Sequence, residues 1–272
     1  YISEESRPFL QSLGVPFSVW NLPEIRKLAV TAPDGSGLES KLDPGGFGVS
    51  RYLLDATLAS IARTAGVHLM EETRVSDIWY ENGLMKLRLS MDVITARVAV
   101  GSYGKRSNLD LKWKRDFVQQ KQGKLNNLLG VKYHVKADLP ADTIALHNFR
   151  DGYCGVSQIE NGQYCLCYLT NAANLGLCNN SIRQMEDRVL GSNPALGRLL
   201  RSVERVWAEP VSISQVSFAR KSQVEDHVLM VGDAAGMITP LCGNGMSMAL
   251  HGSKMLAAQV ADFLSGKISR QE

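Results

Sequence analysis

The sequence predicts an α/β protein in which a doubly wound domain with a parallel sheet carries an inserted antiparallel sheet. An apolar run at residues 228–231 ends in Gly-Asp and is followed by a glycine-bearing loop and an amphipathic helix from about Gly245. Such short apolar runs are typical of parallel strands that are covered on both faces. Residues 112–219 instead alternate between apolar and polar positions in several short stretches, which is typical of antiparallel strands. With 272 residues, 44% of them hydrophobic, the chain can bury a core of this size.

The first fifty residues predict a helix and a hairpin. Residues 1–13 are expected to be helical, because apolar side chains recur on one side and Ser3 can cap the first turn. Three prolines then divide the chain into extended pieces. Residues 27–32 and 38–42 flank a turn at 34–37 and are expected to pair.

A second helix and three strands are expected next. Ser50 can cap a helix that continues to Ala65 and ends at Gly66. Residues 67–70 are expected to form a strand. Residues 75–79 and 84–89 alternate around an Asn-Gly turn, and a further strand at 93–100 leads into the segment GSYGKRSNLD.

The region from 112 to 219 predicts a sheet with helices packed beside it. The expected strands lie at 130–135, 143–149, 152–158, 163–170 and 211–218, and the expected helices at 181–191 and 193–203.

The segment after the apolar run at 228–231 has the features of a ligand site. Asp233 follows directly, at the strand end where ligands of α/β sheets bind. Gly243 and Gly245 allow the backbone to approach a flat ligand. The helix that starts there presents unpaired N–H groups and a partial positive charge, which suit an anionic ring edge.

This segment resembles the second flavin-binding motif of the para-hydroxybenzoate hydroxylase and geranylgeranyl reductase superfamily, G-D-A-A-x-x-x-x-P-x-x-G-x-G-[MI]. The resemblance implies an FAD/NAD(P)-binding domain like that of glutathione reductase. It also implies that Asp233 binds the ribityl chain of FAD and that the backbone after the Gly-x-Gly faces the N1/O2 edge of the isoalloxazine. The matching residues are Gly232, Asp233, Ala234, Ala235, Pro240, Gly243, Gly245 and Met246.

Two further segments resemble motifs of the same superfamily. Residues 51–66 resemble R-x-x-[LF]-D-x-x-L-x-x-x-A-x-x-x-G, in which the arginine, here Arg51, reaches ribityl or phosphate oxygens. Residues 103–110 resemble D-G-x-x-S-x-x-R only in part, because Tyr103 replaces the Asp and Asp110 the last Arg. These replacements put a nicotinamide-linked role in question. The residues that the resemblance assigns to FAD are Arg51, Val75, Gly232, Asp233, Pro240, Gly243, Gly245, Met246 and Ser247.

The first βαβ unit of such a domain is not recognisable. No G-x-G-x-x-G follows a strand, and the chain begins with Tyr1. We therefore expect the chain to be truncated at its N-terminus and to lack the residues that hold the ADP half of FAD. The expected domains are a substrate-side helix and hairpin at 1–50, parts of the FAD domain at 51–107 and 220–272, and a substrate domain at 108–219.

Composition excludes several other classes. A net charge of +3 is too small to indicate a nucleic-acid partner. Five cysteines without a C-x-x-C pair indicate reduced thiols, a cytoplasmic location and no zinc or other metal site. No apolar run is long enough to span a bilayer, although peripheral membrane contact stays open. The sequence assigns no catalytic residue: His134, His147 and His251 are isolated, and Tyr153 and Cys154 fit a sheet better than a reaction centre.

The function predicted from these motifs is an FAD-dependent oxidoreductase, monooxygenase-like and driven by NAD(P)H, that acts on an apolar small molecule. The reductases' Tyr-x-Trp-x-Phe-Pro stretch is replaced here by residues 153–157, Tyr-Cys-Gly-Val-Ser, and the halogenases' Trp-x-Trp-x-Ile-Pro is absent. Two alternatives stay open: a geranylgeranyl-reductase-like enzyme that reduces C=C bonds, and a non-catalytic binding protein resembling the dissociation inhibitors.

Overall fold

The computed structural model describes residues 1–119 and 127–270, and it contains two compact units. Unit 1 comprises Tyr1–Val67 and Gln122–Val216, and unit 2 comprises His68–Lys121 and Ser217–Glu272. These units differ from the predicted domains because residues 51–67 lie in unit 1, and because residues 108–119 and 217–219, predicted in the substrate domain, lie in unit 2. Among the residues described, no helix has the length and apolar character required to cross a membrane.

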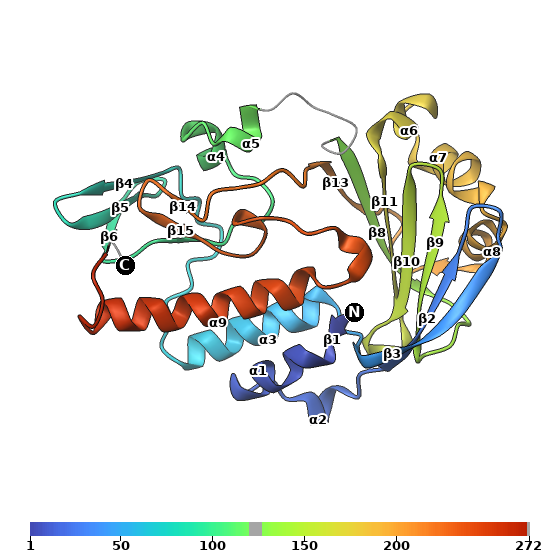
Figure 1. Ribbon diagram of the computed structural model, residues 1–272, viewed down its shortest axis with the longest axis horizontal. Helices are drawn as coiled ribbons and strands as arrows, with labels where there is room; N and C mark the ends of the chain where they lie inside the picture. The colour runs from blue at the N-terminus through green and yellow to red at the C-terminus, as the bar shows by residue number, and fades with distance from the viewer. Residues whose placement is uncertain (120–126, 271–272) are drawn as a thin grey trace. The chain divides into compact units, whose positions relative to one another are not determined.

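Unit 1 is built on one nine-stranded sheet in the order β1-β3-β2-β9-β10-β11-β8-β12, with β13 also paired to β8 (Figure 1). Only β2 and β9 pair in parallel; the other neighbours are antiparallel. The strands are β1 (Ile2–Ser3), β2 (Glu24–Thr31), β3 (Gly37–Phe47), β8 (Leu128–Lys136), β9 (Thr143–Phe149), β10 (Gly152–Gln158), β11 (Tyr164–Asn171), β12 (Glu204–Arg205) and β13 (Val211–Val216).

The core of unit 1 lies between one face of this sheet and the helices α6 (Ala172–Leu177), α7 (Ile182–Arg188) and α8 (Pro194–Ser202) (Figure 1). Val131, Tyr133 and Val135 of β8 are buried there with residues of β10 and β11. Because successive side chains of a strand point to opposite faces, Lys132 and His134 lie on the other face. The structure confirms five predicted strands of this unit within a few residues, at 130–135, 143–149, 152–158, 163–170 and 211–218. It also confirms the helices predicted at 181–191 and 193–203.

The N-terminal region corrects one prediction. The helix expected at 1–13 is only α1 (Arg7–Ser12), preceded by a 3-10 turn, because Ile2 and Ser3 pair with β3 as a strand. The hairpin of β2 and β3 is confirmed. A short helix, α2 (Phe17–Trp20), precedes it, and α3 (Arg51–Thr64) follows it, capped as predicted by Ser50, whose hydroxyl accepts from the Leu53 amide at 3.1 Å.

The part of unit 2 that the structure describes contains two three-stranded sheets and three α-helices. One sheet has the order β4-β5-β6 and the other β14-β15-β7. The elements are β4 (Asp77–Glu81), β5 (Leu84–Arg88), β6 (Val93–Ala96), β7 (Val100–Gly101), β14 (Val224–Glu225), β15 (Val228–Met230), α4 (Asn108–Lys112), α5 (Asp116–Gln119) and α9 (Gly245–Leu264).

Two predicted strands of unit 2 are wrong in detail. Residues 67–70 form no strand: the segment is irregular, and Val67 and Met70 are about half exposed, since no neighbouring strand pairs with them. The strand predicted at 93–100 is divided into β6 and β7, which belong to different sheets. The hairpin of β4 and β5 is confirmed.

Candidate functional site

The predicted parallel strand at 228–231 is confirmed as β15. It pairs in parallel with β7: the Leu229 amide donates to the Ala99 carbonyl and the Val231 amide to the Gly101 carbonyl, both at 3.1 Å. Gly232 has φ of +61° and starts a 3-10 turn that contains Asp233. A positive φ of this kind favours glycine. Because the strands are parallel, the turn after β15 and the segment 102–107 after β7 begin at the same edge of the sheet.

The start of α9 supplies unpaired backbone donors. Gly243, with φ of +67°, closes a 3-10 turn over Pro240–Cys242, and Asn244 is the N-cap without a side-chain capping bond. The first α-helical bond runs from the Met248 amide to the Asn244 carbonyl at 2.9 Å. The amides of Gly245, Met246 and Ser247 therefore precede the hydrogen-bond ladder and are available to a ligand.

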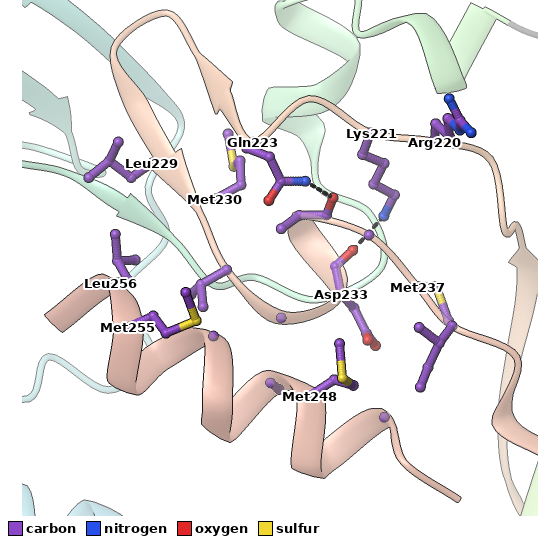
Figure 2. Close-up of a pocket in the computed structure, with 18 of the residues that line it drawn as sticks. Arg220, Lys221, Gln223, Leu229, Met230, Asp233, Met237, Met248, Met255 and Leu256 are labelled. Atoms are coloured by element: carbon purple, nitrogen blue, oxygen red, sulfur yellow. Dashed lines mark hydrogen bonds between the residues drawn. The ribbon is translucent and has the colours of Figure 1, made fainter. Parts of the chain in front are cut away.

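A cavity of about 740 Å³ lies within unit 2 between the turn after β15 and α9 (Figure 2). Asp233 is exposed and lines this cavity, and its carboxylate points toward the first turns of α9 near Met248 (Figure 2). No described residue donates a hydrogen bond to that carboxylate. Much of the wall is apolar, with Met230, Met237, Ile238, Met248, Met255 and Leu256.

Positive charge borders the same cavity. Arg220 and Lys221 both line it. The Lys221 ammonium donates to the main-chain carbonyls of Lys105 at 2.7 Å and Asp233 at 2.6 Å. Burial lowers the pKa of Lys221, although the charge of Asp110 opposes this shift. Lys221 thus connects the segment after β7 to the turn after β15.

The residues of this cavity fit the middle part of an FAD molecule. Ser247 does not line the cavity itself, but it lies in the first turn of α9, and its Oγ is buried without a hydrogen-bond partner among the described residues. A Cβ atom built on Gly236 or Gly245 would meet nothing within 4 Å, so the backbone is open there. A carboxylate that can accept from hydroxyls, helix-terminal amides and an apolar wall match a ribityl chain and a ring with one polar edge.

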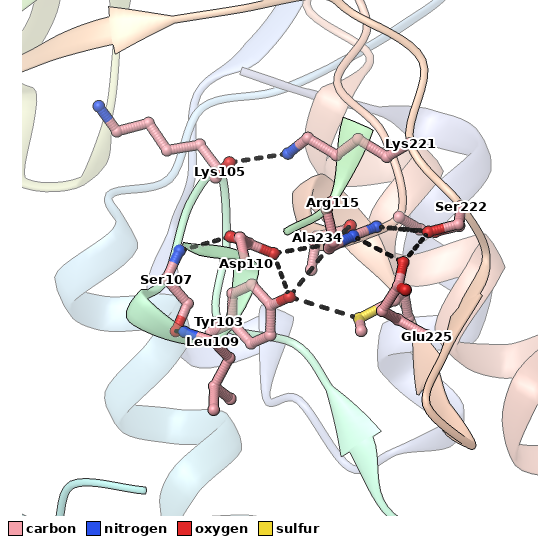
Figure 3. A network of polar contacts seen from close by, with 12 residues as sticks. Tyr103, Lys105, Ser107, Leu109, Asp110, Arg115, Lys221, Ser222, Glu225 and Ala234 are labelled. Carbon is pink, nitrogen blue, oxygen red and sulfur yellow. Dashed lines mark hydrogen bonds and ion pairs between the residues drawn. The ribbon is translucent and has the colours of Figure 1, made fainter. Parts of the chain in front are cut away.

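A buried polar network lies beneath the turn after β15 (Figure 3). The Arg115 side chain, 1% exposed, donates to the Asp110 carboxylate at 2.8 Å and to the Ala234 carbonyl at 3.1 Å. It also donates to the Ser222 carbonyl at 2.8 Å. The bond to the Ala234 carbonyl therefore fixes the turn that carries Asp233 to the buried Arg115 side chain.

Tyr103 and Asp110, the two departures from the superfamily motif, contact each other. The Tyr103 hydroxyl donates to the Asp110 carboxylate at 2.6 Å, and burial followed by this bond raises the pKa of Tyr103. Asp110 also accepts from the Ser107 amide at 2.6 Å and completes a capping box on α4. Sequence reasoning missed Arg115, but Ser107-x-x-Asp110 is a capping-box pattern that could have indicated the role of Asp110.

The remaining predicted site residues lie in several places. Arg51 is the first residue of α3 in unit 1, where its guanidinium pairs with Asp55 at 2.8 Å. Val75 packs against the core of unit 2, Pro240 is exposed, and Met246 is half-buried. The structure brings Gly232, Asp233 and Gly245 together around the cavity and does not place Arg51 relative to them.

Comparison with known proteins gives matches in sequence and in fold, although no family model matches. A digeranylgeranylglycerophospholipid reductase of Methanothrix thermoacetophila is 26% identical over 96% of this chain and 67% of its own length. Conditioned medium factor receptor 1 of Dictyostelium discoideum is 26% identical over 82% of this chain. The match covers 45% of the receptor, so the chain spans less than half of that relative.

Solved structures of flavoproteins share the fold. A triple mutant of a flavin-dependent brominase matches with a TM-score of 0.78 and 17% identity, covering 98% of this chain and 70% of the brominase. The myxobacterial chondrochloren halogenase, an FAD-dependent enzyme, has a TM-score of 0.75 and 17% identity over 100% of this chain and 67% of its own. A flavoprotein/dehydrogenase from Cytophaga hutchinsonii has a TM-score of 0.75 and 16% identity, covering 98% and 69% of the two chains. The chain therefore has the mixed α/β fold of FAD-dependent halogenases and flavoprotein oxidoreductases, and the matches confirm its resemblance to the para-hydroxybenzoate hydroxylase and geranylgeranyl reductase superfamily.

Proposed function

We propose that this chain forms the flavin-facing part of an FAD-dependent oxidoreductase, monooxygenase-like, that takes hydride from NAD(P)H and acts on an apolar small molecule. The single observation that supports the proposal most is the Asp233 carboxylate, to which no described residue donates a hydrogen bond, on the same cavity of about 740 Å³ as Gly245 at the start of α9. Bound FAD would supply the redox chemistry, since no protein side chain accepts hydride.

The residues around the cavity would bind and orient the flavin. The Asp233 carboxylate would accept hydrogen bonds from hydroxyls of the ribityl chain. The amides of Gly245, Met246 and Ser247 would donate to the polar edge of the ring, where the partial positive charge of the helix N-terminus favours negative charge. The methionine-rich wall would exclude water from the ring. Arg220 and Lys221 add positive charge at the rim.

A second candidate is a reductase of C=C bonds. The match to digeranylgeranylglycerophospholipid reductase extends over 96% of the chain and favours this activity, although residues 153–157 depart from the reductases' own motif. The match to a receptor instead favours a non-catalytic binding protein.

A cytoplasmic location is also part of the proposal. It is supported by the free thiols that a reducing compartment maintains, those of Cys154, Cys165, Cys167 and Cys178.

The test is flavin retention by the full-length protein carrying Asp233→Asn. The wild-type protein should show a flavin absorbance spectrum after gel filtration. A hydrogen bond to a charged group contributes about 1.5–3 kcal/mol, so the variant should bind FAD about ten- to a hundredfold more weakly. Asp226→Asn makes the same change of charge in the exposed turn before β15 and should leave flavin binding unaltered.

A colourless full-length protein would exclude the proposed flavin site. Equal FAD affinity of Asp233→Asn and wild type would exclude the role assigned to Asp233. Two further measurements separate a monooxygenase from a reductase. For a flavin-containing protein, oxygen consumption with NADPH and substrate indicates a monooxygenase. Anaerobic loss of a substrate C=C bond indicates a reductase.

A further inference from the structure

The face of the unit 1 sheet opposite α6, α7 and α8 carries a cluster of reactive side chains. On β8 and β11 the register places Cys165 opposite His134, and Cys167 opposite Lys132. Directly opposed residues have their Cβ atoms about 4.5–5.5 Å apart. The residues between them, Tyr133, Leu166 and Tyr168 among others, are buried against the helices on the other face. The two thiols, the ammonium and the imidazole therefore share one side of the sheet.

Both thiols are free and lie on this face of the sheet. Cys167 is exposed and Cys165 is half-buried, whereas Cys154 points into the core and is buried. A thiol becomes reactive where it is partly exposed and close to positive charge, because the thiolate is the nucleophile. Cys165 and Cys167 both meet these conditions, and Cys154 does not.

The charged groups around Cys165 favour its thiolate. The neighbouring Cys167 lowers the pKa of Cys165 most, and the charge of Lys132 lowers it further, although burial opposes both effects. The pKa of Cys167 shifts the opposite way, because Cys165 and burial raise it. Glu160 is an acidic group that acts on His134.

His134 adds a flat, partly apolar surface beside the thiol. Burial, and after it the charge of Lys132, lowers the pKa of His134 and so favours the neutral ring. Its Nε2 atom is buried and has no hydrogen-bond partner among the described residues. Trp207, 47% exposed, and Tyr52, 65% exposed, lie with ring centroids 5.0 and 6.0 Å from the imidazole. A planar conjugated molecule could stack on these rings next to Cys165.

We propose that Cys165, supported by Cys167 and Lys132, is a nucleophilic site that forms covalent adducts with α,β-unsaturated carbonyl compounds. The Cys165 thiolate attacks the β-carbon, a C–S bond forms, and the C=C π pair moves onto the carbonyl oxygen as an enolate. The Lys132 ammonium stabilises the thiolate and this developing charge. The thiol proton leaves to water and the α-carbon takes a proton from water, so the net reaction is addition across the double bond without any oxidant.

The experiment uses N-ethylmaleimide, an α,β-unsaturated imide, on the whole protein between pH 5.5 and 9. Fragment-ion mass spectrometry distinguishes adducts at Cys165 from those at Cys167. The rate at Cys165 should have its inflection at least about one pH unit below the ordinary thiol value near 8.5. Cys165→Ser should abolish the fast adduct.

Lys132→Met and Lys136→Met form a matched pair. Lys136 lies two residues further along β8, is 62% exposed and pairs with Glu204. Removal of a neighbouring charge raises a thiol pKa by about one unit, which at pH 5.5, below the lowered pKa of Cys165, reduces the thiolate population about eightfold. The gain in intrinsic nucleophilicity offsets part of this loss, so Lys132→Met should react about threefold more slowly than wild type at pH 5.5. Lys136→Met should react at the wild-type rate.

Three outcomes would overturn the proposal: an ordinary thiol inflection at Cys165, a first adduct at Cys167, or equal rates for the two lysine variants. Should Lys132→Met fail to fold, as judged by circular dichroism, Cys167→Ala takes its place. This variant removes the thiol that lowers the pKa of Cys165, so the Cys165 inflection should move to higher pH, and an unmoved inflection contradicts the proposal.

Discussion

Replacing Arg115 with methionine should destabilise unit 2 and loosen the turn that carries Asp233. The Arg115 side chain is 1% exposed and that of its partner Asp110 is fully buried. Arg115→Met keeps the length of the side chain but removes its charge and its bonds to Asp110, Ala234 and Ser222. Asp110 would then remain as a buried carboxylate that only Tyr103 and the Ser107 amide satisfy.

The expected loss is about 3–5 kcal/mol, the usual result of removing one partner from a buried ion pair. Solvent does not screen the ion pair of Arg115 and Asp110, because both side chains are excluded from water. Replacing both partners, in Asp110→Asn with Arg115→Met, removes the uncompensated charge and should recover a large part of the loss.

Hydrogen exchange resolved by segment is the suitable measurement, because it reports each unit separately. The amides of Leu229 and Val231, which bond to the carbonyls of Ala99 and Gly101, should lose about two to three and a half orders of magnitude of protection. Amides of β10 and β11 in unit 1 are the internal reference. Lys267→Met breaks an exposed pair with Asp262 in the same unit and should change stability by less than about 0.5 kcal/mol. A loss below about 1 kcal/mol for Arg115→Met would refute the supporting role of this network.

Three further predictions concern unit 1. The Glu186 carboxylate accepts from the hydroxyls of Tyr133 at 2.7 Å and Tyr168 at 3.0 Å and pairs with Arg205, so Glu186→Gln should cost about 1–3 kcal/mol by chemical denaturation. An unchanged ultraviolet titration of the tyrosines in that variant would contradict the view that Glu186 contributes to the raised pKa of Tyr133. Burial lowers the pKa of His147 below 6.5, so between the folded pKa and 6.5 the unfolded chain binds more protons and stability should rise with pH. His147→Asn should flatten the stability–pH curve in this window, and an identical slope for variant and wild type would count against the assignment. A Cβ at Gly48 would lie 1.8 Å from the Gln158 carbonyl oxygen, so Gly48→Ala should lower the melting temperature strongly or prevent folding. Gly176→Ala on α6, where a Cβ meets nothing within 4 Å, should instead raise stability by about 0.5–1 kcal/mol, and similar melting temperatures for the two alanine variants would show that space at Gly48 is not limiting.

The strands and helices of unit 1 could be predicted well because their signals are local. Alternation over seven residues marked β9 and β10 at their observed bounds, and Ser50 marked the start of α3. Residues 67–70 have the same apolar character as a strand, but a strand also needs a partner, and none of the described residues pairs with this segment. Ile2 and Ser3 were predicted to be helical, but they pair with β3 as a strand, because tertiary pairing prevails over the helical pattern.

The sequence by itself determined the strand, the acid, the glycine-opened turn and the helix from β15 to α9, because each of these signals lies within about thirty-five consecutive residues. Only the tertiary structure decided that Arg115 reaches the Ala234 carbonyl, 119 residues away, and that Tyr103 and Asp110 satisfy each other. It likewise brought Cys165 and Cys167 beside His134 and Lys132, through a register that no local pattern specifies. Periodicity and capping act over a few residues, whereas the partner of a buried charge is decided when distant segments pack and exclude water.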